Sequence, residues 1–380
     1  MDLDYFTRVV YSVALIFGLT ALVGCSEDGR SSGAQITVTQ EPTVETFEWK
    51  MVTSWPKNLP GLGIAPENLA NHVDKMSAGR LKIKVYGAGE LVQALEVFDT
   101  VSNGAAEMGH TAAYYWQGKV PEAAFFATVP FGMNAMEMNS WIHHGGGLEL
   151  WRELYEPFNL IPFAAGNSGV QMAGWFNKEI NSLEDFQGLK MRIPGLGGKV
   201  FGDVGGVPDN LPGPEIYTSL QTGVIDATEW VGPVNDLAFA LYDIADFYYY
   251  PGWHEPGTTL ELLVNRTAWE SLPEDLQHIV TVATRAVNHD MLDSYTADNY
   301  VALQTLLNDH KVDLRKLPED VLKSLYVESM NTMRNFADPN DELAQRIVDS
   351  YIGFMENVRQ YNEITEIAYN EARAVGKSED

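Results

Sequence analysis

The alternation of strand-like and helix-like segments is the feature that most restricts how this chain can fold. Residues 47–53 form a first candidate strand, and residues 81–86 alternate apolar and polar side chains, which is typical of a strand with one buried face. Residues 66–77 and 92–102 have the spacing of helices, and a third strand is expected at 106–110. Because parallel strands need long crossovers between them, this order predicts a mostly parallel sheet covered by helices.

The same pattern returns further along the chain, at residues 170–177, 188–193 and 224–227. It predicts a second α/β lobe, and a chain of 380 residues is long enough for two. Glycine and proline cluster at 165–169 and 252–259, where we expect the chain to cross between the lobes. Ligands of such sheets lie at the carboxyl ends of strands, so both lobes are expected to face one cleft.

The expected domain organisation follows from these segments together with the two ends of the chain. In order, we expect a signal peptide at 1–24, a flexible tether at 25–46, a first lobe at 47–167 with 230–258, a second lobe at 168–229 with 259–310, and C-terminal helices at 311–380. The tether is rich in Ser, Gly, Thr and acidic residues, which favours a flexible segment over packed structure.

The N-terminus has the pattern of a secretion signal. Residues 9–23 are almost uncharged, and the run is too short for a stable membrane span. Leu22-Val23-Gly24-Cys25 fits a bacterial lipobox, in which the cysteine is lipidated and becomes the new N-terminus. An ordinary signal peptide with an incidental cysteine is the alternative. The sequence therefore predicts a periplasmic protein that is anchored to a membrane through lipidated Cys25.

Cysteine usage and charge exclude several classes of function. Cys25 is the single cysteine, so the rest of the chain has no disulfide and no thiol for catalysis or zinc binding. The chain has 52 Asp and Glu against 25 Lys and Arg, a formal net charge of −27. Nucleic acid and anionic membrane surfaces are therefore poor partners, because the negative charge of the chain would be repelled by both.

Arg192 is the first candidate binding residue. It lies on the otherwise apolar strand 188–193, where a guanidinium is costly to bury unless it meets an anion. Its planar fork matches a carboxylate ligand through two parallel hydrogen bonds. A structural ion pair with one of the many acidic residues of the chain is the alternative.

Two segments around this arginine carry a specific resemblance to a known family. Residues 188–194 (GLKMRIP) and 215–227 (EIYTSLQTGVIDA) resemble the signature of TRAP-transporter solute receptors of the DctP family, within a match from about residue 47 to past residue 264. The resemblance implies an α/β, two-lobed periplasmic-binding-protein fold with the ligand cleft between the lobes and a long C-terminal helix. It also implies a receptor that delivers its solute to TRAP membrane subunits and is not an enzyme.

Three further segments look like one branch of that family. They are 166–171 (GNSGVQ), 226–233 (DATEWVGP) and 250–257 (YPGWHEPG), and they resemble the branch that binds α-keto or α-hydroxy monocarboxylates together with a metal ion. The implied solute is a small organic acid of the pyruvate, lactate or longer oxo-acid class.

The resemblance implies a set of site residues, and the chemistry of each residue type agrees with its role. The solute contacts are expected at Arg192, Gln171, Asn167 and Trp230. From the aromatic run 114–116, of which some side chains should line the pocket and most should pack in the core, Tyr114 is also expected to contact the solute. Glu229 and Glu255 would repel the carboxylate of the solute, and a hard cation, Na⁺ or Ca²⁺, resolves that conflict. Its expected ligands are the two glutamates, the amide oxygen of Gln171 and the backbone carbonyl of Trp230. Without the resemblance, the two glutamates would be interpreted as solvated surface groups.

Two rival functions share some of these features. A secreted metal-dependent enzyme acting on oxo acids would need a catalytic motif, but His143 and His144 are adjacent and point to different faces, and the glycines at 145–147 precede no serine elbow. The segment 141–155 is expected to be a surface helix. The receptor of an ABC importer has the same two-lobed plan, and only the family signature argues against it.

The C-terminal segment 340–373 predicts a long amphipathic helix. It contains no proline and only Gly353, and apolar residues recur at alternating steps of four and three, which keeps them on one face. Such a helix would extend roughly 50 Å. It could wrap across both lobes of its own chain, but the stripe continues past what that needs, so we predict a homodimer formed through this helix.

Overall fold

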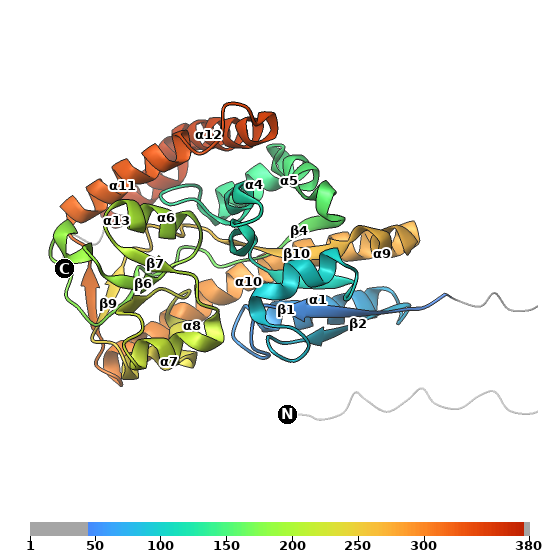
Figure 1. Ribbon diagram of the computed structural model, residues 1–380, viewed down its shortest axis with the longest axis horizontal. Helices are drawn as coiled ribbons and strands as arrows, with labels where there is room; N and C mark the ends of the chain where they lie inside the picture. The colour runs from blue at the N-terminus through green and yellow to red at the C-terminus, as the bar shows by residue number, and fades with distance from the viewer. Residues whose placement is uncertain (1–44, 376–380) are drawn as a thin grey trace, which may run out of the picture. The chain divides into compact units, whose positions relative to one another are not determined.

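The computed structural model describes residues 45–375 (Figure 1). The predicted signal peptide, nearly all of the tether and the lipidation site at Cys25 lie outside these residues. The strands are β1 (Phe47–Thr53), β2 (Leu81–Tyr86), β3 (Met108–Thr111), β4 (Leu160–Asn167), β5 (Gly174–Phe176), β6 (Lys190–Arg192), β7 (Val207–Asp209), β8 (Ala227–Thr228), β9 (Phe247–Tyr250), β10 (Thr259–Asn265) and β11 (Asp313–Lys316). The α-helices are α1 (Ile64–Met76), α2 (Val97–Ser102), α3 (Ala124–Ala127), α4 (Ala135–His144), α5 (Gly147–Tyr155), α6 (Gly195–Asp203), α7 (Ile216–Gln221), α8 (Pro233–Ala238), α9 (Arg266–Ser271), α10 (Glu274–Asn308), α11 (Glu319–Arg334), α12 (Glu342–Asn362) and α13 (Ala368–Ala374).

The first sheet has five strands in the order β2-β1-β3-β10-β4. β1 pairs in parallel with β2 and β3, while β10 runs antiparallel between β3 and β4. Alternate residues of β1 and β2 face a core shared with α1 and α10, which includes Met51, Leu69 and Leu276. The bounds of β1 and β2 are those predicted from the spacing of apolar residues, because that spacing directly reflects which face of a strand is buried.

The second sheet has six strands in the order β11-β9-β5-β8-β6-β7. β6 pairs in parallel with β7 and β8, while β5 runs antiparallel to β8 and β9. Residues of α6 and α11, among them Phe201 and Leu325, form a core with this sheet.

Two chain segments lie in the sheets opposite to those expected. Residues 230–258 were assigned to the first lobe, yet β9 pairs with β5 and β11 in the second sheet. Residues 259–310 were assigned to the second lobe, yet β10 pairs with β3 and β4 in the first. The physical reason is that strand pairing is decided by contacts between residues far apart in sequence, which local periodicity does not encode.

The segment 141–155 is also not the surface helix that was expected. It belongs to two helices, α4 and α5, separated at Gly145 and Gly146, and Gly146 has a φ of 87° that favours glycine. Trp141 and Trp151 are fully buried and stack on Phe126 with ring centroids 5.3 and 5.2 Å away. These aromatic contacts hold both helices in the core.

The C-terminal segment is helical from Glu342 to Ala374, with a π-helical stretch at Glu363–Ile367 between α12 and α13. Its first part packs against α4 and α5, where Ile347 and Tyr351 are buried and the Tyr351 hydroxyl accepts a hydrogen bond from the Met133 amide at 3.0 Å. In its last part, Tyr361, Ile364 and Tyr369 are 63, 75 and 63% exposed. The first part of the predicted amphipathic helix is therefore buried against its own chain, whereas apolar side chains of its last part are exposed.

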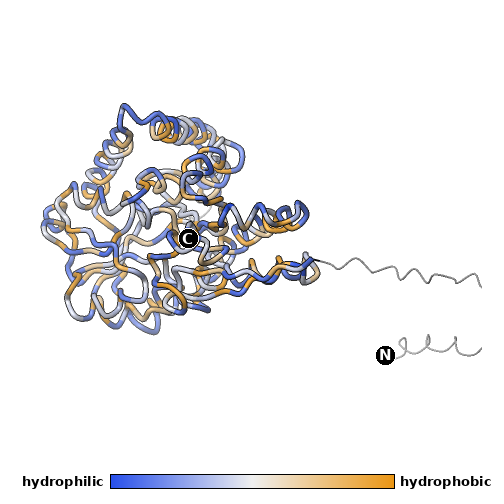
Figure 2. Tube along the Cα trace, turned by 45° about the vertical axis from the view of Figure 1, so that its right-hand side comes forward, coloured by the Kyte–Doolittle hydropathy of each residue, from blue (hydrophilic) through white to orange (hydrophobic). Residues whose placement is uncertain are grey.

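Figure 2 shows hydrophilic and hydrophobic residues alternating along the helices, as expected for helices with one buried face. None of the helices between residues 45 and 375 is long and apolar enough to cross a membrane.

Candidate functional site

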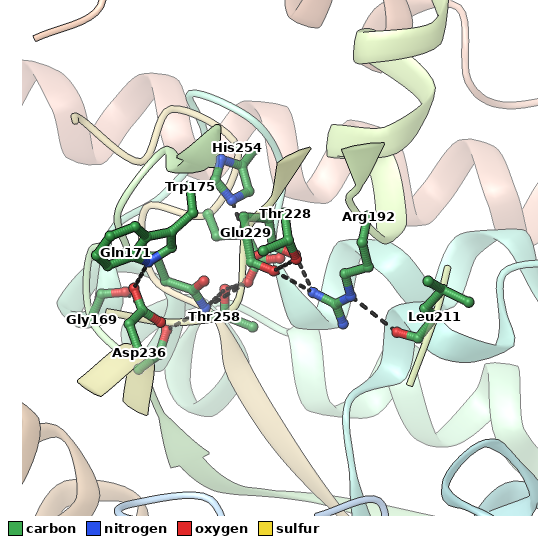
Figure 3. Close-up of polar contacts among 12 residues, drawn as sticks. Gly169, Gln171, Trp175, Arg192, Leu211, Thr228, Glu229, Asp236, His254 and Thr258 are labelled. Atoms are coloured by element: carbon green, nitrogen blue, oxygen red, sulfur yellow. Dashed lines mark hydrogen bonds and ion pairs between the residues drawn. The ribbon is translucent and has the colours of Figure 1, made fainter. Parts of the chain in front are cut away.

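Four segments that are distant in sequence meet at one buried place (Figure 3). Arg192 is the last residue of β6, and Glu229 directly follows β8, the parallel neighbour of β6. Because the carboxyl ends of neighbouring parallel strands lie at the same edge of a sheet, these two side chains come together. Gln171 and Glu255 lie on the segments 168–173 and 251–258, which connect the two sheets.

The two connecting segments are held against each other by their main chains. The Gln171 amide donates to the Glu255 carbonyl at 3.1 Å, and the Gly252 amide donates to the Gln171 carbonyl at 3.0 Å. A Cβ at position 252 would lie 2.1 Å from that same carbonyl oxygen. Only glycine permits so close an approach, and this approach places the side chains of Gln171 and Glu255 in contact.

Arg192 is fully buried and its guanidinium is bonded to the protein on several sides. Nε donates to the Leu211 carbonyl at 3.0 Å, and Nη2 donates to the Tyr115 hydroxyl at 3.3 Å. Nη1 donates to the Glu229 carbonyl at 3.1 Å and to the Glu229 carboxylate, with which it forms an ion pair. The guanidinium carbon also lies 5.1 Å from the centroid of the Trp230 ring. The structural ion pair considered from the sequence is therefore present at this arginine.

Burial and charge act in opposite directions on these two groups. Burial disfavours the charge on Arg192, but the combined attraction of Glu229, Tyr115, Tyr114 and Glu255 outweighs it, so the pKa of Arg192 lies above its ordinary value. Burial raises the pKa of Glu229 to about 7, although Arg192 opposes that rise. The arginine therefore keeps its charge, and Glu229 is an acid that changes protonation near neutral pH.

Glu255 is bound by neutral donors on one oxygen only. Its Oε2 accepts hydrogen bonds from Gln171 Nε2 at 2.7 Å and from Thr258 Oγ1 at 2.5 Å. Burial, followed by repulsion from Glu229, raises the pKa of Glu255 to about 7. Because Gln171 uses its nitrogen here, its amide oxygen is left for another partner.

Several polar atoms of this cluster are buried and have no hydrogen-bond partner within residues 45–375. They are Gln171 Oε1, Glu229 Oε2 and both ring nitrogens of His254. The His254 Nε2 lies 3.4 Å from Glu229 Oε2, and burial lowers the pKa of His254 to about 4, so the ring is neutral. An unpartnered buried polar atom costs about 1–3 kcal/mol, so a cluster of them indicates a site for a ligand.

The atoms of this cluster fit a cation. Ligand atoms of Glu229, His254 and Glu255 all lie within 4.8 Å of one another. Two carboxylates and an amide oxygen are the ligands that a hard cation such as Na⁺ or Ca²⁺ prefers. Bound there, a cation would supply the positive charge that offsets two neighbouring carboxylates.

A narrow cavity of about 10 Å³, room for about one water, adjoins the cluster, and aromatic and aliphatic side chains form most of its wall. Its lining residues are Trp55, Leu62, Tyr114, Tyr115, Ser168, Gln171, Trp230, Val231, Thr258 and Leu260. A mainly apolar wall with a few polar anchors is the general form of small-ligand sites.

The structure brings together most of the predicted site residues. Arg192, Glu229, Glu255 and Gln171 form the polar cluster, while Tyr114 and Trp230 line the cavity. Asn167 is placed differently. Its Nδ2 donates to the Gly257 carbonyl at 3.2 Å and its Oδ1 accepts from the Gly169 amide at 2.9 Å. Asn167 therefore joins β4 to the 251–258 segment and does not line the cavity.

Several residues of the site were not predicted, and Tyr115 and His254 are the two that belong to its polar cluster beside predicted neighbours. Tyr115 bonds to Arg192, and His254 contributes ring nitrogens to the cluster. Both belong to segments that the sequence had singled out, the aromatic run 114–116 and the motif 250–257. Adjacency to Tyr114 and Glu255 was the only signal, and it does not tell which of two neighbours faces the site.

Comparison with known proteins gives one family and several close relatives. Residues 51–339 match the family described as DctP, bacterial extracellular solute-binding protein, family 7. The monocarboxylate 2-oxoacid-binding periplasmic protein of Nostoc sp. is 42% identical over 362 residues, which are 95% of this chain and 97% of that protein.

Two solved structures are similar over their whole length. A TRAP periplasmic solute-binding protein from Pseudoalteromonas atlantica, with bound sodium and pyruvate, is 42% identical, with a TM-score of 0.83 over 86% of this chain and 99% of that one. A TRAP solute-binding protein from Bordetella bronchiseptica is 35% identical, with a TM-score of 0.85 over 88% and 100%. It is described as a mixed-occupancy dimer, with calcium and picolinate in one site and the other site apo. These likenesses confirm the predicted α/β two-lobed receptor fold.

Proposed function

The chain belongs to the DctP family of bacterial extracellular solute-binding proteins, and we propose that it is the receptor of a TRAP transporter for a small 2-oxo or 2-hydroxy monocarboxylate. This family consists of transport receptors, so neither an enzyme nor an ABC-importer receptor is favoured. The pyruvate bound to the Pseudoalteromonas relative supports a solute of that class, and the sodium and calcium of the relatives support a cation in the cleft.

The observation that carries the proposal is one buried arginine beside a pair of buried carboxyls at the wall of a small cavity. In this proposal Arg192 binds the carboxylate of the solute. Glu229, Glu255, the Gln171 amide oxygen and the Trp230 carbonyl hold the cation, and the solute completes its shell through a carboxylate oxygen and the α-oxygen. Tyr114 contacts the solute from the wall.

A thermal unfolding panel tests the proposal. A ligand that binds only the folded state stabilises it by about 2.7 kcal/mol at a hundredfold excess over its dissociation constant. Pyruvate, lactate and branched 2-oxo acids should raise the melting temperature in the presence of calcium. A sugar or an amino acid that shifts the curve while every oxo and hydroxy acid leaves it unmoved would disprove the assignment.

We further propose that the mature protein begins at lipidated Cys25 and faces the periplasm. The lipobox residues 22–25 support this proposal. Mass spectrometry of the membrane fraction should find an N-terminal Cys25 carrying a diacylglycerol. Replacing Cys25 by serine should release the protein from the membrane, and recovery of the wild-type protein without lipid would contradict the anchor.

A homodimer through the C-terminal helix is the remaining proposal on assembly. The exposed Tyr361, Ile364 and Tyr369 on the last part of that helix support it, as does the dimer described for the Bordetella relative. Because α12 is packed into its own chain, the informative truncation lies after Asn362 and leaves Tyr351 in place. Light scattering should show a dimer for the mature protein and a monomer for the truncated one, and a monomeric mature protein would refute the proposal.

A further inference from the structure

The donors of Arg192 are already engaged on both edges that a carboxylate could use. A guanidinium presents one fork through Nη1 and Nη2 and another through Nε and Nη2. Nη1 is bonded to Glu229, and Nε is bonded to the Leu211 carbonyl at 3.0 Å. A solute carboxylate can therefore form two parallel hydrogen bonds with Arg192 only after one of these protein groups has moved away.

Glu229 is the group that can leave. Leu211 contributes a main-chain carbonyl, whereas the carboxylate of Glu229 is at the end of a side chain with rotatable bonds. Its second oxygen, Oε2, already points away from Arg192 toward His254, whose Nε2 lies 3.4 Å away (Figure 3). A rotation of this side chain would free one Nη1 hydrogen, while the other stays on the Glu229 main-chain carbonyl at 3.1 Å, and would direct both carboxylate oxygens toward the cluster with His254 and Glu255.

When both glutamates are ionised, charge opposes that rotation unless a cation is present. Arg192, Glu229, Glu255 and a solute carboxylate then together carry two net negative charges. Separating Glu229 from Arg192 would leave two buried carboxylates side by side with no positive charge between them, and an uncompensated buried charge is strongly unfavourable. A divalent cation among Gln171, Glu229 and Glu255 balances the site completely, whereas a monovalent cation leaves one negative charge.

We infer that Glu229 has a second role as a positioning residue, because it occupies the edge of Arg192 that would bind a carboxylate. The solute can bind to this edge only when the Glu229 side chain has turned toward the cation. The inference rests on the proposed function, because it concerns the same site. It deepens that function because it sets an order, in which cation binding precedes solute binding.

The test is cation-free solute binding by two isosteric variants, Glu229→Gln and Glu255→Gln. Both replace a buried carboxylate of the proposed cation site, but only Glu229 is bonded to Arg192. Pyruvate binding is measured by calorimetry on dialysed protein in a sodium-free buffer with a chelator, and again with saturating calcium. Cation dependence of the wild type alone cannot decide the question, because a cation that merely bridges solute and protein produces it too.

Without a cation, Glu229→Gln should bind pyruvate about tenfold more tightly than the wild type, since a neutral amide competes less well for Arg192. Glu255→Gln also removes one negative charge but leaves the Glu229–Arg192 bond in place, so its gain should be much smaller. Equal behaviour of the two variants without a cation would overturn the inference. If the wild type with calcium binds no oxo acid, the proposed function fails instead, so the two failures are distinguishable.

A kinetic measurement on the wild type covers the case in which Glu229→Gln does not fold. Trp55 and Trp230 line the cavity and can report binding by fluorescence. When cation-free protein is mixed with excess pyruvate and calcium together, the observed rate should follow the calcium concentration and not that of pyruvate. A rate that follows pyruvate, whether or not the protein was first incubated with calcium, would refute the proposed order.

Discussion

Buried carboxyl groups occur in two contrasting environments in this protein. Glu261, on β10, has both oxygens bonded to neutral donors, with Trp116 Nε1 at 2.6 Å and the Tyr155 hydroxyl at 3.1 Å. Glu229 and Glu255 instead lie beside a buried arginine, and the cluster around them contains polar atoms without a partner among the described residues. Burial raises the pKa in both environments, to about 8 for Glu261 and about 7 for Glu229 and Glu255.

The difference teaches that burial of an acid alone does not mark a binding site. Glu261 is satisfied by its own neighbours and can remain protonated, so it needs no further partner. The carboxyls of the cleft are incompletely satisfied and close enough to repel each other. Unpartnered atoms combined with a nearby opposite charge therefore distinguish the binding cluster from a structural acid.

The largest expected effect on solute binding comes from Arg192→Lys. A lysine keeps the charge but cannot form the planar fork, so solute affinity should fall about a hundredfold, as judged by calorimetry with saturating calcium. Arg346→Lys is the matched control, because Arg346 forms an ion pair with Glu153 on the surface. Equal loss in both variants, or none at position 192, would show that Arg192 acts only in the structure.

The same isosteric change in the two environments should affect the cation differently. Glu255→Gln should weaken calcium binding about tenfold or more, because it removes a charged ligand from the cluster. Glu261→Gln should leave the calcium dissociation constant unchanged. A comparable loss of calcium affinity in both variants would mean that the substitutions act by disturbing the fold. The contrast between the binding cluster and the structural acid would then be wrong.

The structural acid should be visible in the pH dependence of stability. Because the pKa of Glu261 is raised from 4.5 to about 8 in the folded protein, the folded state binds more protons than the unfolded state between these values. Its contribution is full below pH 4.5 and is lost as the pH rises toward about 8. At pH 8 to 9 Glu261→Gln should therefore be more stable than the wild type, by about 4 kcal/mol at about 1.4 kcal/mol per pKa unit, and the two should converge at about pH 5. The free energy of unfolding, measured with denaturant for both proteins across this pH range, gives the difference. A difference that stays constant with pH would contradict the prediction.

The smallest expected effects concern the two tyrosines that contact these groups. Tyr115→Phe removes a hydrogen-bond partner of Arg192 and should weaken solute binding about threefold, with little effect on unfolding. Tyr155→Phe removes a donor to Glu261 and should lower stability by about 1 kcal/mol without changing solute affinity. The reverse pattern would show that the division between binding cluster and structural acid is wrong.

Local features of the sequence determined much of this protein. The period of apolar residues predicted β1 and β2 with their observed bounds. The motifs around Arg192, Glu229 and Glu255, through their resemblance to the DctP family, predicted residues that the fold brings into one cluster.

Tertiary structure alone decided the remaining features. The sheets to which β9 and β10 belong, the burial of Trp141 and the choice of His254 and Tyr115 all depend on contacts between residues far apart along the chain. The pairing of Arg192 with Glu229 also depends on tertiary structure. Arg192 ends β6 and Glu229 follows β8, and the two meet because these strands lie parallel and in register. Periodicity reports which face of an element is buried, but it does not specify which distant partner covers that face.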